Sequence, residues 1–86
     1  MLESSEEAVV LRAALHARPA GALVRATAHF DATVEVCFGE RSANARGVLA
    51  VLALGAPAGS TVVIRATGPD ATAALNAAVD SLAQAE

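Results

Sequence analysis

The chain has 86 residues, a hydrophobic fraction of 55%, only two aromatic residues and a formal net charge of -3, with six arginines and no lysine. This length allows one domain with one modest core, so we expect a single domain over residues 1–86. No apolar run reaches the roughly 18 residues that cross a bilayer, which predicts no membrane insertion. The composition does not favour nucleic acid as a partner, because its binding usually needs a basic surface and stacking side chains.

The first residues and the single cysteine bear on the cellular compartment. Glu3, Glu6 and Glu7 stand where a secretory signal would carry positive charge, so we expect a cytoplasmic protein. Cys37 has no partner for an internal disulfide, which agrees with a reducing compartment. The chain also lacks a compact pattern of metal ligands, so we expect neither a metal nor a cofactor.

The first half of the chain predicts a strand followed by a helix. Residues 8–12 alternate, which predicts a strand with Val9 and Leu11 on one side. From residue 17 to about residue 28, four side chains recur at i, i+3, i+4 and i+7. This spacing predicts a helix with one buried side formed by Ala20, Leu23, Val24 and Thr27.

The middle of the chain predicts a hairpin and a short helix. Residues 33–38 alternate strictly, which is typical of a half-buried strand with a solvated outer face. A tight turn at Gly39 leads into a weaker edge strand over residues 41–45. Residues 47–54 are rich in Leu and Ala and end at Gly55, which favours a short helix over a strand.

The last third predicts a loop, a strand and a helix. Residues 56–60 are the loop, and residues 61–67 alternate as a strand. Gly68, Pro69 and Asp70 predict a helix start, with proline at its beginning and an acid in its first turn. Its buried side is expected to be Leu75, Ala78, Val79 and Leu82. The order is therefore βαββαβα, an α+β fold with an antiparallel sheet and helices on one face.

His16 is the candidate reactive residue. Pro19 suits the first turn of a helix, which predicts that the helix begins just after His16. The first N–H groups of a helix lack intrahelical partners, so a phosphoryl group on His16 would meet donors around Ala17 and Arg18. The Arg18 guanidinium matches phosphate oxygens, and a neutral imidazole offers a nucleophilic nitrogen at cellular pH. The alternative is a structural or merely exposed histidine.

The segment of residues 14–20, ALHARPA, closely resembles the active-site signature of the HPr family, the histidine-containing phosphocarriers of the bacterial phosphoenolpyruvate-dependent sugar phosphotransferase system. The resemblance continues without a gap through residues 30–32, 44–55 and 74–77. It implies an open-faced sandwich of a four-stranded antiparallel sheet and three helices. It also implies that His16 Nδ1 accepts a phosphoryl group from phosphorylated Enzyme I and passes it to an EIIA domain. Such a protein is a carrier rather than a stand-alone enzyme.

By the same resemblance, Arg18 stabilises the phosphoryl group, and the sequence departs from the family pattern at two places. Ala13 and Ala14 stand where many members carry a polar residue and a glycine, so we expect an ordinary backbone conformation before His16. Gly47 stands where low-GC Gram-positive members carry a regulatory serine, so serine phosphorylation is excluded at that position. Ser42 is expected to be a solvated strand residue rather than a substitute.

The short helix at residues 47–54 carries more apolar side chains than one buried stripe can hold. The family docks its partners on this helix and the preceding one. We therefore expect a partner face formed by Val48, Leu49, Leu52, Arg25 and Arg46. Within it, Leu49 and Leu52 are expected to be exposed, whereas Val51 and Leu54 are assigned to the core. The arginines would meet acidic partners and affect association rates.

Three further expectations remain open. His29 matches no metal motif and is assigned a structural or exposed place. The chain is expected to be a monomer. The alternatives to the general sugar carrier are a regulatory module that binds partners without transferring phosphate, and a branch-specific carrier of the nitrogen-related or dihydroxyacetone-related kind. A small-ligand sensor would need a pocket, for which the alanine-rich core offers little room.

Overall fold

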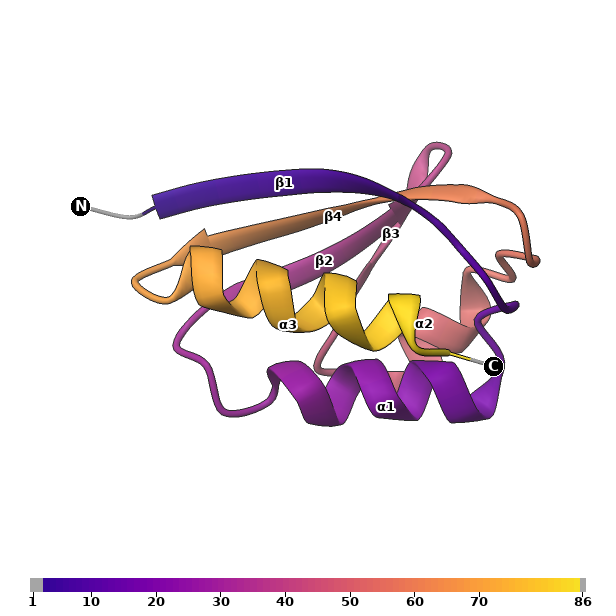
Figure 1. Ribbon diagram of the computed structural model, residues 1–86, viewed down its shortest axis with the longest axis horizontal. Helices are drawn as coiled ribbons and strands as arrows, with labels where there is room; N and C mark the ends of the chain where they lie inside the picture. Colours follow the sequence, from indigo (N-terminus) through magenta and orange to yellow (C-terminus); the bar gives the residue numbers. More distant parts are fainter. Residues whose placement is uncertain (1–2, 86) are drawn as a thin grey trace.

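The computed structural model describes residues 3–85, and its elements follow the predicted βαββαβα order (Figure 1). The strands and helices are β1 (Glu3–Val10), α1 (Ala17–Thr27), β2 (Thr33–Phe38), β3 (Arg41–Asn44), α2 (Val48–Ala53), β4 (Thr61–Gly68) and α3 (Ala71–Ala83). Within the described residues, no helix has the length and apolar character needed to span a membrane.

The strands form one four-stranded antiparallel sheet in the order β1-β4-β2-β3. The three helices lie on one side of this sheet, and the other side stays uncovered (Figure 1). The α+β open-faced sandwich is therefore confirmed. Inward-facing residues meet across the strands, since Ile64 of β4 pairs with Val36 of β2. Both are fully buried, as the alternation of the two strands predicts.

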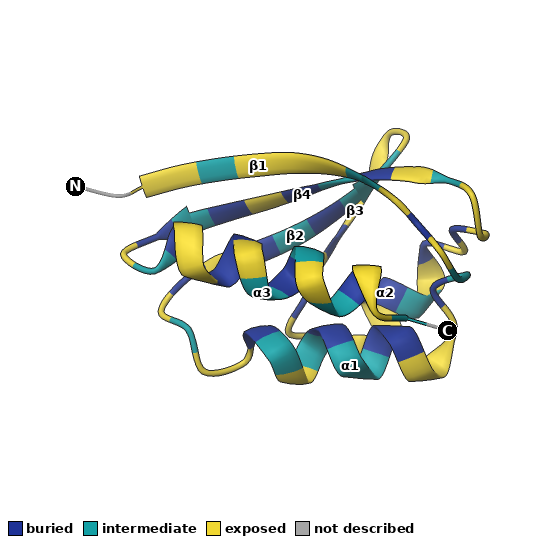
Figure 2. Cartoon of the chain, in the orientation of Figure 1, coloured by how far each residue is buried: buried dark blue, intermediate teal, exposed yellow. Residues whose placement is uncertain are grey.

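The core fills the space between the sheet and the helices. Figure 2 shows buried residues on the sides of α1 and α3 that face the sheet. The α3 side of the core consists mainly of alanine, which lets the helix pack close to its neighbours. Of the four residues assigned to the buried side of α3, Leu75, Ala78 and Leu82 are buried, and Val79 is half-buried against the core.

The first strand differs most from its prediction. It runs from Glu3 to Val10 rather than over residues 8–12, because its pairing with β4 begins at Glu3 opposite Gly68. Glu3, Ser4, Glu6 and Glu7 of this edge strand are exposed, so its first half shows no alternation of apolar and polar residues in the sequence. Leu11 is buried as expected, but it follows the strand, where its N–H donates to Ser60 O at 2.8 Å.

The start of α3 also differs from its prediction. The helix begins at Ala71, so Asp70 occupies the N-cap rather than the first turn. Its carboxylate does not cap the helix but accepts a hydrogen bond from Asp31 N–H at 2.7 Å, while Asp70 N–H donates to Asp31 O at 3.0 Å. Gly68 approaches the same loop so closely that an added Cβ would lie 3.0 Å from Asp31 O. These contacts fix the loop after α1 against the start of α3.

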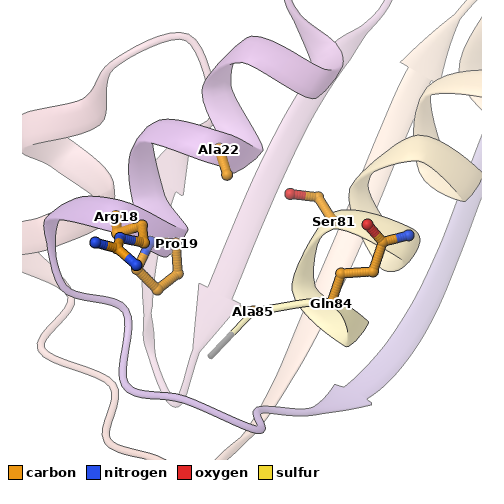
Figure 3. Close-up of a pocket in the computed structure, with 6 residues that line it drawn as sticks. All are labelled: Arg18, Pro19, Ala22, Ser81, Gln84 and Ala85. Carbon is orange, nitrogen blue, oxygen red and sulfur yellow. The ribbon is translucent and has the colours of Figure 1, made fainter.

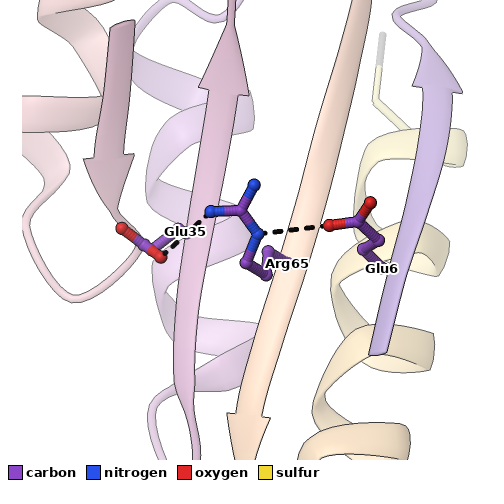
Figure 4. A network of polar contacts seen from close by, with 3 residues as sticks. All are labelled: Glu6, Glu35 and Arg65. Carbon is purple, nitrogen blue, oxygen red and sulfur yellow. Dashed lines mark hydrogen bonds and ion pairs between the residues drawn. The ribbon is translucent and has the colours of Figure 1, made fainter. Parts of the chain in front are cut away.

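The uncovered face of the sheet carries a charged row across three strands (Figure 4). Arg65 Nε of β4 lies 3.2 Å from Glu6 Oε2 of β1, and its Nη1 lies 3.9 Å from Glu35 Oε1 of β2. The hydrogen bond with Glu6 raises the pKa of the Arg65 guanidinium. Glu35 and Cys37 are half-buried rather than fully solvated, because side chains of the neighbouring strands flank them. The expectation of a solvated outer face is thus met only in part.

Candidate functional site

The start of α1 places His16 at the N-cap. Its backbone is extended, with φ -87° and ψ -169°, and the helix begins at the next residue, as predicted from Pro19. Pro19 is buried in the first turn, where its missing N–H interrupts no helical hydrogen bond. The His16 side chain is exposed, so its ring is open to a partner protein.

Two backbone donors at this helix start have no partner within residues 3–85. The first bond closing the helix runs from Ala20 N–H to His16 O at 3.0 Å. Pro19 has no N–H, so the unpaired donors of the first turn are those of Ala17 and Arg18. The first turn of α1 also contains no acidic side chain. The helix dipole is positive at this end, so the arrangement favours an anion beside His16.

The loop before His16 is held by two hydrogen bonds. Leu15 N–H donates to Ala56 O at 3.0 Å, and His16 N–H donates to Ala14 O at 2.8 Å. The Leu15 side chain is buried. No residue other than glycine has a positive φ within the described chain, which confirms the ordinary backbone expected at Ala13 and Ala14.

A groove beside His16 joins this loop to the end of α2. On the α2 side, the groove is lined by Leu52 and by residues 55–57, which follow the C-cap of the helix. The full lining is Ala14, Leu15, His16, Leu52, Gly55, Ala56 and Pro57. The sequence predicts the helix over residues 47–54 and only a loop over residues 56–60, so it does not place Ala56 and Pro57 beside His16. The helix-ending Gly55 was the one sequence signal for a turn at this place.

The α2 helix presents an apolar surface that is smaller than predicted. Leu49 is 77% exposed and Val51 is buried, both as expected, and Val48 is 37% exposed. Leu54 is buried as expected too. The expected exposure of Leu52 is wrong in degree, because Leu52 is half-buried and packs against the core. Its position lies 100° around the helix from Val51, at the border of the buried side.

Arg18 and Arg25 both project from α1 and are exposed. Arg18 lines a second pocket, of about 250 Å³, between the start of α1 and the end of α3. Figure 3 shows Arg18 and Pro19 on one side of this pocket and Ser81 and Gln84 on the other. Neither Arg18 nor Arg25 has a hydrogen bond or ion pair from its side chain within residues 3–85, so both guanidinium groups are available to external anions.

Arg46 lies far from His16. Its Nη1 and Nη2 donate to Ala28 O and Phe30 O, each at 3.4 Å, just beyond the C-terminal end of α1. The eleven residues of α1 separate the two ends of the helix by roughly 16 Å. Arg46 therefore does not flank the histidine, and its contact with a partner stays a prediction.

The remaining candidates of the sequence analysis lie outside the site. His29 is exposed and stacks on Phe30 with ring centroids 4.6 Å apart. The described residues contain no group of three or more side chains able to hold a metal ion. Gly47 is the N-cap of α2 and offers no hydroxyl, and Ser42 is exposed on β3.

Sequence reasoning missed the roles of two arginines. Arg41 Nη2 donates to the carbonyl oxygens of Ala53, at 3.1 Å, and of Leu54. Arg12 Nη1 donates to Ala83 O at 3.0 Å. Each side chain thus binds the end of a helix that is distant in sequence. No local pattern signals such a contact, because the acceptors are backbone oxygens.

Comparisons with curated proteins place these features in a family. A family model described as the phosphorylation site of the phosphotransferase-system HPr component matches residues 4–84. The chain is 38% identical over 69 residues to the phosphocarrier protein HPr of Treponema pallidum, covering 80% of this chain and 78% of that protein. It is 34% identical over 89 residues to the multiphosphoryl transfer protein of Xanthomonas campestris. That match covers all of this chain but only 11% of the longer protein.

Solved structures agree with the fold. The phosphocarrier protein HPr of Bacillus anthracis superposes with a TM-score of 0.85 at 26% identity, covering 92% of this chain and 96% of that chain. The histidine-containing phosphocarrier protein of a mycoplasma gives a TM-score of 0.84 at 25% identity, with 90% of each chain covered. The family model spans nearly the whole chain, and it includes the helix start that carries His16. The chain therefore belongs to the HPr family of phosphocarrier proteins of the phosphotransferase system.

Proposed function

We propose that this chain carries a phosphoryl group on His16, accepting it from phosphorylated Enzyme I and delivering it to an EIIA domain of a sugar permease. The observation that supports the proposal is the exposed imidazole at the N-cap of α1, beside the unpaired N–H groups of Ala17 and Arg18. Membership of the HPr family supplies the class of donor and acceptor.

In the proposed reaction, Nδ1 of the neutral His16 ring attacks the donor's phosphorus while Nε2 keeps its proton. The bond from phosphorus to the donor breaks as the new nitrogen–phosphorus bond forms, and its electron pair returns to the donor atom. Delivery to the acceptor repeats this exchange with His16 as the leaving group. The two free N–H groups and the Arg18 guanidinium would stabilise the oxygens of the phosphoryl group in both steps.

The exposure of the site suits a carrier. A helix N-terminus at the surface contributes only about 0.3 to 1 kcal/mol to the binding of an anion. Such a contribution stabilises the phosphoryl group without preventing its release. Leu49 and Val48 leave apolar surface exposed on α2, the helix whose end lies beside His16, and this surface would contact both partners.

We further propose that the chain acts as a monomer of one domain in the cytoplasm, where both transfer partners would be reached by diffusion. The relative from Treponema pallidum is itself named a phosphocarrier protein HPr, which favours the general carrier over a branch-specific one.

The test is phosphorylation by Enzyme I and phosphoenolpyruvate, followed by intact-mass measurement. The wild type should gain one phosphate that is lost in acid and kept in base. His16→Ala should gain none, because the acceptor nitrogen is gone. Arg18→Gln should gain it more slowly. No gain on the wild type, or an undiminished gain on His16→Ala, would refute the proposal.

A further inference from the structure

We propose that Arg41, on the edge strand β3, is a positioning residue for His16. Its guanidinium holds the C-terminal end of α2, and that end holds the backbone just before His16. The inference rests on the proposed function, because it concerns the same histidine. It adds a residue that the sequence pattern around His16 does not include.

The first link joins Arg41 to the end of α2. Arg41 Nη2 donates to Ala53 O at 3.1 Å and also to Leu54 O. These oxygens belong to the last turn, where carbonyl groups lack intrahelical donors and the helix dipole is negative. The guanidinium therefore satisfies two carbonyl groups at once and places a positive charge at the negative end.

The short length of α2 makes this contact important. The helix has only six residues, so few internal hydrogen bonds keep its end ordered. Its last turn also contains no basic residue that could bind the free carbonyl groups. Gly55 then leaves the helix in the left-handed conformation at φ +63°. A Cβ placed on Gly55 would lie 4.0 Å from Arg41 Nη2, which shows that the guanidinium lies beside this turn.

The second link joins the end of α2 to the histidine. Ala56, two residues after Leu54, accepts the hydrogen bond from Leu15 N–H at 3.0 Å. Both Ala56 and Leu15 are buried, so this bond is shielded from water. Leu15 directly precedes His16, and Gly55, Ala56 and His16 line the same groove. A shift of the α2 end would therefore move the backbone from which the imidazole projects.

Two other arginines bind helix ends without this connection. Arg46 reaches the carbonyl groups just beyond α1, and Arg12 reaches the last residue of α3. Within the described residues, the α2 end is the only one of these three helix ends that is followed by a backbone hydrogen bond to Leu15, the residue before His16. The position of Arg41, rather than its charge alone, thus separates it from the other arginines.

The test compares Arg41→Ala, Arg41→Lys and the control Arg65→Ala, which removes an exposed arginine from the uncovered sheet face. Urea unfolding first establishes conditions in which all variants are folded. Two quantities are then measured: the kcat and KM of phosphorylation by Enzyme I, and the hydrogen-exchange rate of Leu15 N–H.

We expect Arg41→Ala to lower kcat about fivefold with KM unchanged, and to speed Leu15 exchange by a similar factor, since about one hydrogen bond's contribution is lost. Arg41→Lys should recover part of both losses, because its ammonium can still donate to a carbonyl. Arg65→Ala should match the wild type. The inference would be overturned by any one of four results. These are equal kcat values in Arg41→Ala and Arg65→Ala, an unchanged exchange rate of Leu15 N–H, a rise in KM alone, and no recovery in Arg41→Lys.

The exchange measurement needs no phosphoryl donor, so it separates two kinds of failure. If the wild type is not phosphorylated, the proposed function fails, and Leu15 exchange still decides whether Arg41 positions the loop. If the wild type is phosphorylated and Arg41→Ala behaves as the control does, only the inference about Arg41 fails.

Discussion

The two ends of α1 differ in whether the chain provides hydrogen-bond partners for the free backbone groups there. Beyond the C-terminal end, the carbonyl oxygens of Ala28 and Phe30 accept hydrogen bonds from Arg46. At the N-terminal end, the N–H groups of Ala17 and Arg18 have no partner within the described residues. The chain thus supplies the cation that one end of the helix favours, but no anion for the other end.

The same asymmetry extends to the other helices. Arg41 binds the C-terminal end of α2, and Arg12 binds that of α3. The first turns of all three helices contain no acidic side chain, so this absence is not special to α1. What separates α1 is the exposed His16 at its N-cap, beside two N–H groups without a partner in the described residues. In the proposed function, the anion at this end is the phosphoryl group on His16.

The largest effect should come from removing one of the two free donors. Ala17→Pro deletes an N–H at the first helical position, where proline is well tolerated. The backbone of His16 is already extended, as a residue before proline requires. The helix should therefore persist, while the rate of His16 phosphorylation falls about tenfold because one hydrogen bond to a charged group is lost.

Ala17→Ser provides the matched control, because it keeps the N–H and its side chain projects from an exposed position. Helix content by circular dichroism should be the same for both variants. A phosphorylation rate in Ala17→Pro equal to that of Ala17→Ser would show that the backbone donor does not contribute.

A smaller effect should follow at the opposite end. Arg46→Ala removes the two 3.4 Å hydrogen bonds beyond α1, and the exposed carbonyl groups can bind water instead. We expect the free energy of unfolding in urea to fall by about 0.5 kcal/mol. The phosphorylation rate of His16 at saturating Enzyme I should stay unchanged, because Arg46 and His16 lie at opposite ends of the helix. A slower transfer under these saturating conditions would contradict this prediction, whereas a raised KM with the same saturated rate would support the predicted contact of Arg46 with the partner.

Local patterns were enough to predict most of the fold. Alternation over residues 33–38 and 61–67 predicts β2 and β4, and the proline at residue 19 predicts the start of α1. Each of these signals depends only on residues that are close together in the sequence. The position of His16 at a helix start follows from Pro19 alone, and the structure confirms it. The roles of His16 and Arg18 in transfer remain predictions.

Features set by distant contacts could not be predicted in this way. The first strand extends to Glu3 because β4 pairs with it, although its exposed polar residues show no pattern. The half-burial of Leu52 depends on where α2 rests against the core. The contacts of Arg41 and Arg46 with helix ends could not be predicted for a similar reason. Their acceptors are backbone oxygens, which no side-chain pattern marks.

In the proposed function, the backbone N–H groups of Ala17 and Arg18 donate hydrogen bonds to the phosphoryl group on His16. The most direct measurement is a pair of ¹H–¹⁵N spectra of the protein before and after phosphorylation by Enzyme I. We expect both amide protons to shift downfield, because new hydrogen bonds to a charged acceptor form, while the amide signal of Phe30 at the far end of α1 stays in place. A phosphorylated His16 with unchanged amide signals at Ala17 and Arg18 would contradict this expectation.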